Sequence, residues 1–355
     1  MSRRAATLTI ASVLVLVLVL VGSLMPVPYV ALMPGPTSNT LGTNDKGEPL
    51  IKISGAGAPQ TYPDSGHLNF TTVTYRGGPG NRIDLFTALR GWLEDDTAIV
   101  PEETIFPKNE SQQQVDEENT RQMRDSQENA EAAALHELGK PVSTQVVVDQ
   151  VQKGMPAEGK LQPNDEIVAV DGTQVTSVAK VTELMSKRKV GDPVELTIKR
   201  GGKEQKVKLT TVASPSNAGR AVVGVVLADD YKFPFDINIS VGDIGGPSAG
   251  LMFSLAIVDK LTPESLTGGK FIAGTGTITP EGKVGPIGGI QQKMIAARRA
   301  GATVFLTPKD NCSDALAARP DGLRLVRADS LHQARQSLEA LSSGKGGDLP
   351  ACSKG

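Results

Sequence analysis

Two short segments in the second half of this 355-residue sequence carry residue types that can act on a carbonyl group. In the first, Gly245-Gly246-Pro247-Ser248-Ala249-Gly250 leads directly into an apolar run over 251–258. This pattern is typical of a glycine-rich turn that starts a helix, with proline near the first helical position. A serine there lies beside unpaired backbone N–H groups, which can hold the oxyanion that forms when its hydroxyl attacks a carbonyl. Taken alone, the pattern also fits a turn that only caps a helix.

The second segment places a lysine on the apolar face of a predicted helix. If the helix begins near residue 290, its positions i, i+3, i+4 and i+7 are Ile290, Lys293, Met294 and Ala297. Burial of an ammonium group lowers its pKa toward the neutral amine. A neutral amine beside a hydroxyl can act as the general base for that hydroxyl. In isolation, a lysine that reaches solvent from the edge of the face explains the same pattern.

The remaining composition excludes several other kinds of chemistry. A Ser-His-acid triad would need His67, His136 or His332, and we expect all three to be structural or exposed. His136-Glu137 begins a zinc-protease motif, but Lys140 stands where the second histidine is required, so we predict no metal site. No Gly-Lys pair is followed by Ser or Thr, so we predict no phosphate-binding loop and no nucleotide cofactor. A net charge of −2 gives no broad attraction to nucleic acid.

The start of the sequence predicts a membrane anchor. Residues 5–25 contain no charged side chain, and a helix of this length spans roughly 30 Å, the thickness of a bilayer core. Arg3 and Arg4 precede this stretch and no basic residue follows before Lys46, so residues 1–4 are expected in the cytoplasm and the rest outside. A cleaved secretory signal peptide is the alternative. In both cases the working domains lie outside the cytoplasm, and the anchored form is a single-pass protein of the cell membrane.

Residues 26–140 are interpreted as an extracytoplasmic lead-in. Residues 26–57 are rich in Pro, Gly, Ser and Thr and indicate a tether or an irregular lead-in. Residues 68–75 partly alternate between apolar and polar side chains and predict a strand. A short amphipathic helix follows, with its apolar side formed by Ile83, Leu85, Phe86, Leu89 and Trp92. Residues 108–135 are dense in charged and amide side chains, which favours a solvated helix.

Residues 141–228 follow the strand, turn and helix pattern of a small β-rich domain. The run from Gly159 through Leu161, Asp165 and Ile167 to Asp171-Gly172 resembles the PDZ domain family. The resemblance implies a module that binds peptide ends by strand addition, with a backbone loop that holds the terminal carboxylate. In the circularly permuted bacterial form this loop comes at the end of the module, which places it at Val223, Gly224 and Val225. A PDZ-shaped spacer that binds no peptide is the alternative.

Residues 229–342 contain the serine and lysine segments in one order. The runs 246–250, 275–279 and 285–293 resemble the proteolytic domain of the Lon proteases, a serine–lysine dyad family. The resemblance implies that Ser248 is the nucleophile and that Lys293 is the general base, which also protonates the leaving amine.

The same resemblance extends to supporting groups and includes one departure. Thr275 would orient the lysine, and the backbone N–H of Ser248 and a neighbouring amide would form the oxyanion hole. Lon proteases commonly carry an acidic residue three positions before the serine, where this chain has Gly245, and the nearest acid is Asp243. The departure puts the role of that acid in doubt and leaves the dyad intact.

Together these features predict an α/β (α+β) Lon-type proteolytic domain, preceded by the PDZ domain and an N-terminal transmembrane helix and followed by a tail over 343–355. The whole chain resembles the membrane-anchored PDZ-containing Lon-like proteases of bacteria. This implies an ATP-independent serine endopeptidase that acts on unfolded or regulatory protein substrates selected by its PDZ domain, and that self-associates, as a hexamer by resemblance. A catalytically inactive PDZ scaffold of the cell envelope is the alternative. Outside the cytoplasm Cys312 and Cys352 can form one bridge, but their positions in the sequence do not decide whether they do.

Overall fold

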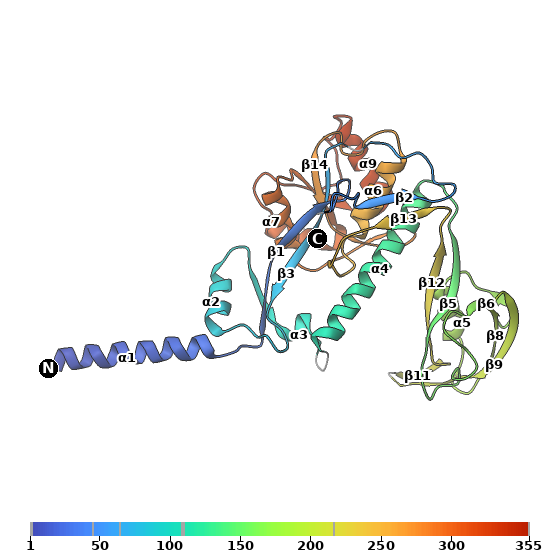
Figure 1. Ribbon diagram of the computed structural model, residues 1–355, viewed down its shortest axis with the longest axis horizontal. Coiled ribbons are helices and arrows are strands. Elements are labelled where there is room, and N and C mark those ends of the chain that lie inside the picture. Colours follow the sequence, from blue (N-terminus) through green and yellow to red (C-terminus); the bar gives the residue numbers. More distant parts are fainter. Residues whose placement is uncertain (1–2, 45, 64, 108–110, 216, 354–355) are drawn as a thin grey trace. The chain divides into compact units, whose positions relative to one another are not determined.

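The computed structural model describes residues 3–44, 46–63, 65–107, 111–215 and 217–353 (Figure 1). The chain divides into two compact units, of which one comprises Met1–Lys140 together with Phe235–Gly355 and the other comprises Pro141–Pro234. The smaller unit is therefore inserted into the sequence of the larger one. The insertion falls between helix α4 (Gln112–Glu137) and strand β13 (Asp236–Ile239).

The larger unit begins with helix α1 (Arg3–Leu24), at the position of the predicted anchor. By its length and apolar composition this helix is able to cross a membrane. Short elements that follow it are β2 (Ile51–Ser54), which pairs with β13, and the helices α2 (Leu85–Leu93) and α3 (Glu102–Ile105).

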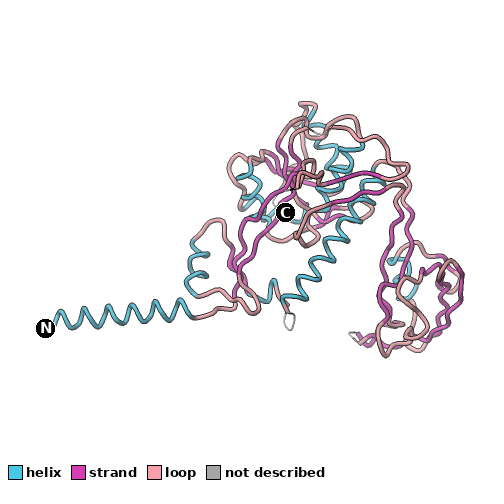
Figure 2. Tube along the Cα trace, viewed as in Figure 1, coloured by secondary structure: helices cyan, strands magenta, loops and turns pink. Residues whose placement is uncertain are grey.

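A six-stranded mixed sheet forms the centre of the larger unit (Figure 2). Its order is β18 (Arg324–Ala328), β17 (Val304–Pro308), β14 (Phe271–Gly274), β3 (His67–Arg76), β1 (Tyr29–Asn39) and β4 (Ala98–Pro101). Strand β14 runs parallel to both β3 and β17, whereas β1 is antiparallel to β3 and β4. Half of the sheet thus comes from before the inserted unit and half from after it, and residues 26–140 belong to the same compact unit as residues 235–355.

Strand β1 corrects the predicted tether over residues 26–57. Its apolar start, Tyr29–Leu32, pairs with β4 on one side and with β3 on the other. Pro34 lies beyond the last β4 partner, and the register shifts between Pro34 and Thr37. Proline is tolerated where one edge of a strand is free or bulged, because no ladder N–H is then lost. The Pro and Gly residues therefore mark a bulge within a strand.

Alternating residues of the central strands separate two apolar cores. On β14, Ile272 belongs to a core shared with α6 (Gly250–Leu261), α4 and α9 (Leu331–Ser342). The next residue, Ala273, belongs to a core shared with α7 (Ile290–Ala300) and α8 (Cys312–Ala317). Since successive side chains of a strand point to opposite faces, α6 and α7 cover opposite faces of the sheet.

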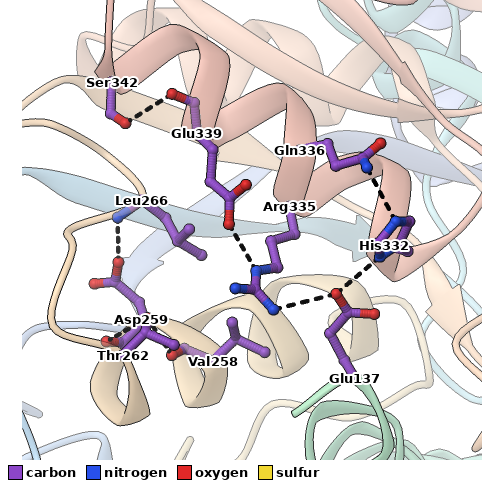
Figure 3. Close-up of polar contacts among 10 residues, drawn as sticks. All are labelled: Glu137, Val258, Asp259, Thr262, Leu266, His332, Arg335, Gln336, Glu339 and Ser342. Carbon is purple, nitrogen blue, oxygen red and sulfur yellow. Dashed lines mark hydrogen bonds and ion pairs between the residues drawn. The ribbon is translucent and has the colours of Figure 1, made fainter. Parts of the chain in front are cut away.

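Helix α4 also differs from the solvated helix that its composition predicts. Ser111 caps its start, Met123 and Ser126 are buried near its middle, and every residue from Ala130 to Leu135 is buried. At its end, the Glu137 carboxylate contacts His332 at 3.0 Å and Arg335 at 3.3 Å, which ties α4 to α9 (Figure 3). Most charged residues of α4 are exposed, but Glu131 is buried, and burial raises its pKa to about 8. The small residues Ala130, Ala133 and Ala134 share a core with α6.

The C-terminal part of the larger unit is closed by short elements and a disulfide. Strands β15 (Thr277–Ile278) and β16 (Val284–Gly285) pair with each other, and a 3-10 turn (Lys309–Asn311) precedes α8. Cys312 and Cys352 are bonded, with their Cα atoms 5.1 Å apart, so the tail is covalently tied to the start of α8. This settles the pairing that the sequence left open.

The inserted unit has its own core and its own sheet. The sheet order is β12 (Val225–Lys232), β5 (Ser143–Val151), β6 (Glu166–Val170), β8 (Pro193–Arg200) and β9 (Lys203–Thr210), with β7 (Thr173–Gln174) beside β6. Helix α5 (Val178–Ser186) and a pair of short strands, β10 (Val212–Ser214) and β11 (Asn217–Val222), complete it. The unit extends to residue 234, six residues beyond the predicted boundary at 228, because β12 runs to Lys232.

Candidate active site

The candidate site lies where strand β14 ends. Thr275 follows the last residue of β14 directly, and its backbone N–H donates to Leu306 O of the neighbouring parallel strand. The first turn of α6 and the first turn of α7 meet there from the two faces of the sheet. Sites in α/β folds commonly form at the carboxyl ends of strands, because loops and helix starts converge at that edge.

The loop that carries Ser248 is fixed through its backbone. The carbonyl oxygen of Ser248 accepts hydrogen bonds from Gly276 N–H at 2.8 Å and from the hydroxyl of Thr275 at 3.0 Å. One turn later, Leu251 N–H donates to Gly276 O at 3.1 Å. Gly246 has φ +86°, a left-handed conformation that favours glycine. The serine is therefore held at the start of α6 with its side chain partly accessible.

Lys293 lies on the first turn of α7 and points into the protein. Its side chain is 3% exposed, and its Nζ lies 2.8 Å from Ser248 Oγ and 3.2 Å from Thr275 Oγ1. Ile290, Met294 and Ala297 of the same face are also buried. Burial lowers the pKa of Lys293 to about 7. The structure thus brings the three residues singled out by the sequence into one hydrogen-bonded group.

This arrangement has the parts that nucleophilic acyl transfer needs. A hydroxyl lies within hydrogen-bond distance of an amine that is substantially neutral near pH 7, and a helix start supplies backbone N–H groups. Each histidine instead has a contact of its own: His67 stacks on Phe271, His136 contacts Pro280 O, and His332 contacts Glu137. Among the described residues, no group of three His, Cys, Asp or Glu side chains is placed to hold a metal ion.

Helix α4 supports the loop that carries Ser248, a role that the sequence did not reveal. The carbonyl of Asn119 accepts a hydrogen bond from Gly246 N–H at 2.8 Å. The buried hydroxyl of Ser126 donates to Pro247 O at 2.9 Å. The only available signal was the helical spacing of Met123, Ser126 and Ala130, which places a serine on the buried side.

The position of α4 also explains Gly245, where Lon proteases commonly carry an acid. A Cβ atom added at Gly245 would lie 2.9 Å from the Cβ of Asn119 and 3.3 Å from its carbonyl carbon. Real Cβ atoms essentially never approach another atom to 2.9 Å, so a larger residue requires the loop or the helix to shift. The close packing of α4 against the loop therefore leaves no room for an acidic side chain at this position.

In the inserted unit, the predicted carboxylate loop leads into the edge strand β12, whose first residue is Val225. Val223 O accepts from Ala157 N–H and Gly224 O accepts from Gln152 N–H, both at 2.9 Å. Gly224 has φ +82°, and a Cβ atom there would overlap Met155. Strand β12, which begins at Val225, pairs with β5 on one side and ends the strand order of the sheet on the other. An edge strand that follows a tight glycine loop is the element to which a peptide can add.

Comparison with known proteins assigns both segments. The PDZ domain family matches residues 115–211, and the Lon protease (S16) C-terminal proteolytic domain matches residues 229–332. The PDZ match begins inside α4, whereas the structure assigns α4 to the larger unit.

Two Lon proteases and a solved PDZ domain are similar to parts of this chain. Lon protease 3 of Sorangium cellulosum is 30% identical over 193 residues, which is 50% of this chain and 22% of the relative. The Lon protease of Geobacter metallireducens is 44% identical over 92 residues, which is 25% of this chain and 11% of the relative. A PDZ domain of an SdrC-like protein from Listeria monocytogenes is 28% identical, covers 23% of this chain and 85% of that domain, and has a TM-score of 0.22. The chain spans only 11–22% of the length of the two Lon relatives named here. By the two family matches, this chain carries a PDZ domain and a Lon-type (S16) C-terminal proteolytic domain.

Proposed function

We propose that the chain is a serine endopeptidase in which Ser248 is the nucleophile and Lys293 the general base. The observation that carries this proposal is the burial of Lys293 with its Nζ 2.8 Å from Ser248 Oγ. A lysine on the apolar face of a helix is unfavourable for stability, because its charged form must be desolvated. Here the same burial supplies an amine with a pKa of about 7, which is suited to proton transfer at neutral pH.

The proposed reaction follows from the geometry of the three side chains. Neutral Nζ of Lys293 accepts the hydroxyl proton as Ser248 Oγ bonds to the carbonyl carbon of the peptide. The oxyanion is held by the backbone N–H of Ser248 and a neighbouring amide at the start of α6. The ammonium of Lys293 then gives its proton to the leaving amine as the C–N bond breaks. The neutral amine takes a proton from a water molecule as the water oxygen bonds to the acyl carbon. It returns that proton to Ser248 Oγ as the ester C–O bond breaks, which releases the acid product and restores the hydroxyl and the neutral amine. Thr275 accepts a hydrogen bond from Nζ and so orients it throughout.

The PDZ domain is proposed to select substrates. An unfolded or regulatory protein would add a strand beside β12, with its terminal carboxylate at the loop formed by Val223, Gly224 and Val225. This proposal is supported by the edge position of β12 and the close-packed Gly224.

We further propose that the protease is anchored by α1 and works outside the cytoplasm, without ATP, as a homo-oligomer. The length and apolar composition of α1 support the membrane anchor. The disulfide between Cys312 and Cys352 supports a location outside the cytoplasm, because disulfides persist in oxidising compartments. The Gly-Lys pairs without a following Ser or Thr support independence from ATP. The homo-oligomer, a hexamer, is proposed from the resemblance to Lon proteases.

The test uses the full chain in lipid nanodiscs, incubated with an unfolded protein in the absence of nucleotide. Wild type is compared with Ser248→Ala, Lys293→Met and a control, Lys283→Met, which replaces an exposed lysine. We expect cleavage by wild type and Lys283→Met only. Cleavage that persists in Ser248→Ala and Lys293→Met contradicts the dyad. Absence of cleavage in all four proteins, together with retained peptide binding, would favour the inactive scaffold.

A further inference from the structure

Helix α2 has an apolar face that is largely exposed. Outside α1 and Met25, six large apolar residues are exposed among the described residues, and four of them lie on α2: Phe86, Leu89, Trp92 and Leu93. Their exposed fractions are 42%, 41%, 55% and 86%. Single exposed apolar residues are normal on a soluble surface, but a cluster of this kind marks an interaction site.

These four side chains share one side of α2, and the opposite side packs inward. Positions 86, 89, 92 and 93 follow helical spacing, so they form one stripe. The buried residues of α2 are Ala88 and Gly91, and a Cβ atom added at Gly91 would meet the side chain of Ile99 at 2.5 Å. The exposed stripe is therefore additional to the face that the helix needs for folding.

The start of α2 is hydrogen-bonded to the chain that leaves α1. Leu85 N–H donates to Met25 O at 3.2 Å, and Val27 N–H donates to Ile83 O at 2.9 Å. The ring of Phe86 lies against Gly22, where an added Cβ atom would meet it at 2.6 Å. Figure 1 shows α2 near the C-terminal end of α1. If α1 spans the bilayer, these contacts hold α2 at the level of the membrane surface.

The chemistry of the stripe suits the boundary between lipid headgroups and acyl chains. Trp92 makes an edge contact with Tyr29, with ring centroids 5.8 Å apart. Trp and Tyr are enriched at this boundary, because each combines an apolar ring with a polar group. The exposed Arg90 flanks the stripe and is paired with Glu94 at 2.7 Å. A short amphipathic helix with Trp, Phe and Leu on one face is typical of a segment that lies in the membrane interface.

We propose that α2 inserts the stripe of Phe86, Leu89, Trp92 and Leu93 into the outer surface of the bilayer that α1 spans. This inference rests on the proposed membrane span of α1. Phospholipid is the partner of this face, because the backbone hydrogen bonds at Met25 and Val27 hold α2 directly after the span. The helix then adds a second, interfacial contact to the anchor.

The test uses the fluorescence of Trp92, which is the only tryptophan in the sequence, so no other tryptophan contributes to the emission. The full chain is reconstituted into phosphatidylcholine nanodiscs, and its fluorescence is compared with that in nanodiscs whose acyl chains carry bromine near the headgroup or near the chain end. Insertion to a depth of about 5–10 Å predicts a blue-shifted emission and a loss of about half of its intensity with the shallow bromines, with less loss for the deep ones. Aqueous iodide is expected to quench weakly.

Two other outcomes would overturn the proposal. Strong quenching by iodide with no effect of brominated lipid means that Trp92 faces water. Protection from both quenchers means that protein, such as a second copy of the chain, covers the stripe. Resistance of the liposome-bound chain to carbonate extraction tests the span of α1 separately. An extractable chain refutes the anchor and this proposal with it, whereas a resistant chain with unquenched Trp92 refutes this proposal alone.

Variants at the two leucines of the stripe sharpen the test. Leu89→Ser combined with Leu93→Ser is expected to reduce the quenching of Trp92 by brominated lipid, because the apolar area available for insertion falls. Val190→Ser, which changes an exposed apolar residue of the inserted unit, is expected to leave the quenching unchanged. Equal quenching in all three proteins would show that the stripe does not drive insertion.

Discussion

The two units of the chain each bury a charged side chain, and they do so in different ways. In the inserted PDZ unit, Asp165 is 1% exposed and is paired with Arg200 through two hydrogen bonds of 2.7 Å. In the larger unit, Lys293 is 3% exposed, and its hydrogen-bond partners are the hydroxyl oxygens of Ser248 and Thr275. The charge of Asp165 is compensated by an ion pair, whereas the amine of Lys293 contacts only neutral hydroxyl oxygens.

This difference has opposite consequences for the two pKa values. Burial alone would raise the pKa of Asp165, but the Arg200 guanidinium and the backbone N–H of Gln162 outweigh it and hold that pKa below its usual value. Burial acts without such compensation on Lys293 and lowers its pKa to about 7. A compensated charge stabilises a fold, while an uncompensated one is retained at a cost, which is typical of a functional group.

The largest expected effect follows from Lys293→Met. Removal of the proposed base should lower kcat/KM by about 10⁴-fold or more, as for other members of nucleophile–base sets.

The Lys293→Met change should also stabilise the folded chain by about 0.5–2 kcal/mol, measured as a higher melting temperature. The unfolded chain has a lysine pKa near 10.5 and the folded chain one of about 7, so between these pH values the unfolded state binds the extra proton. Stability of wild type should therefore rise with pH across this window, and that of the variant should not. A destabilised Lys293→Met protein would contradict this account.

Thr275→Val tests whether the lysine must be oriented. The substitution keeps the shape of a fully buried side chain and removes the hydroxyl that contacts both Nζ and Ser248 O. Misplacement of the amine should lower kcat by up to about 10²-fold with little change in KM, and Thr275→Ser should restore most of it. The matched control is Thr307→Val, at another fully buried threonine. Equal kcat values for the two valine variants would show that Thr275 has no orienting role.

Asp165→Asn tests the other side of the comparison. Loss of a buried charged hydrogen bond should destabilise the PDZ unit by about 1–3 kcal/mol, measured as faster hydrogen exchange over residues 141–234 in the full chain. Cleavage of a short peptide should be unchanged.

The pKa of Asp165 is lower in the folded chain than in the unfolded chain. Its contribution to the free energy of unfolding should therefore be present above the unfolded-state pKa and be lost as the pH falls through the folded-state pKa. The control, Lys206→Gln, removes an exposed partner of Glu195 and should have almost no effect. Equally faster exchange over the larger unit would contradict a stabilising role of the ion pair that is confined to the PDZ unit.

The smallest expected effect belongs to Ser126→Ala on α4. Loss of one hydrogen bond to Pro247 O, about 1 kcal/mol, should lower kcat roughly fivefold and leave KM unchanged. Ser337→Ala is the matched control, because this serine is also 3% exposed but bonds within its own helix, to Gln333 O. If both variants lower kcat equally, the effect reflects general stability and α4 does not position the nucleophile loop.

The sequence allowed prediction of those features whose partners are near in the chain or follow a regular period. The PDZ unit is one contiguous segment, and the face of α7 with Lys293 follows from helical spacing alone. Features that depend on distant partners were not predicted. Strand β1 has its place because β3 pairs with β14, about 200 positions away, as in the pair His67 and Phe271. Ser126 contacts Pro247, although the two residues lie before and after the inserted unit in the sequence. Such pairings leave no local periodicity, so composition suggested a tether and a solvated helix instead.

The most direct test of the central claim, that buried Lys293 supplies a neutral amine to Ser248, is the pH dependence of kcat/KM for a short peptide substrate. The account predicts that kcat/KM rises with pH along a single ionisation with an apparent pKa of about 7, because the ammonium must lose its proton before it can accept that of the serine. It should approach a plateau toward pH 9. A kcat/KM that is constant or falls as the pH increases from 6 to 9 would contradict the claim.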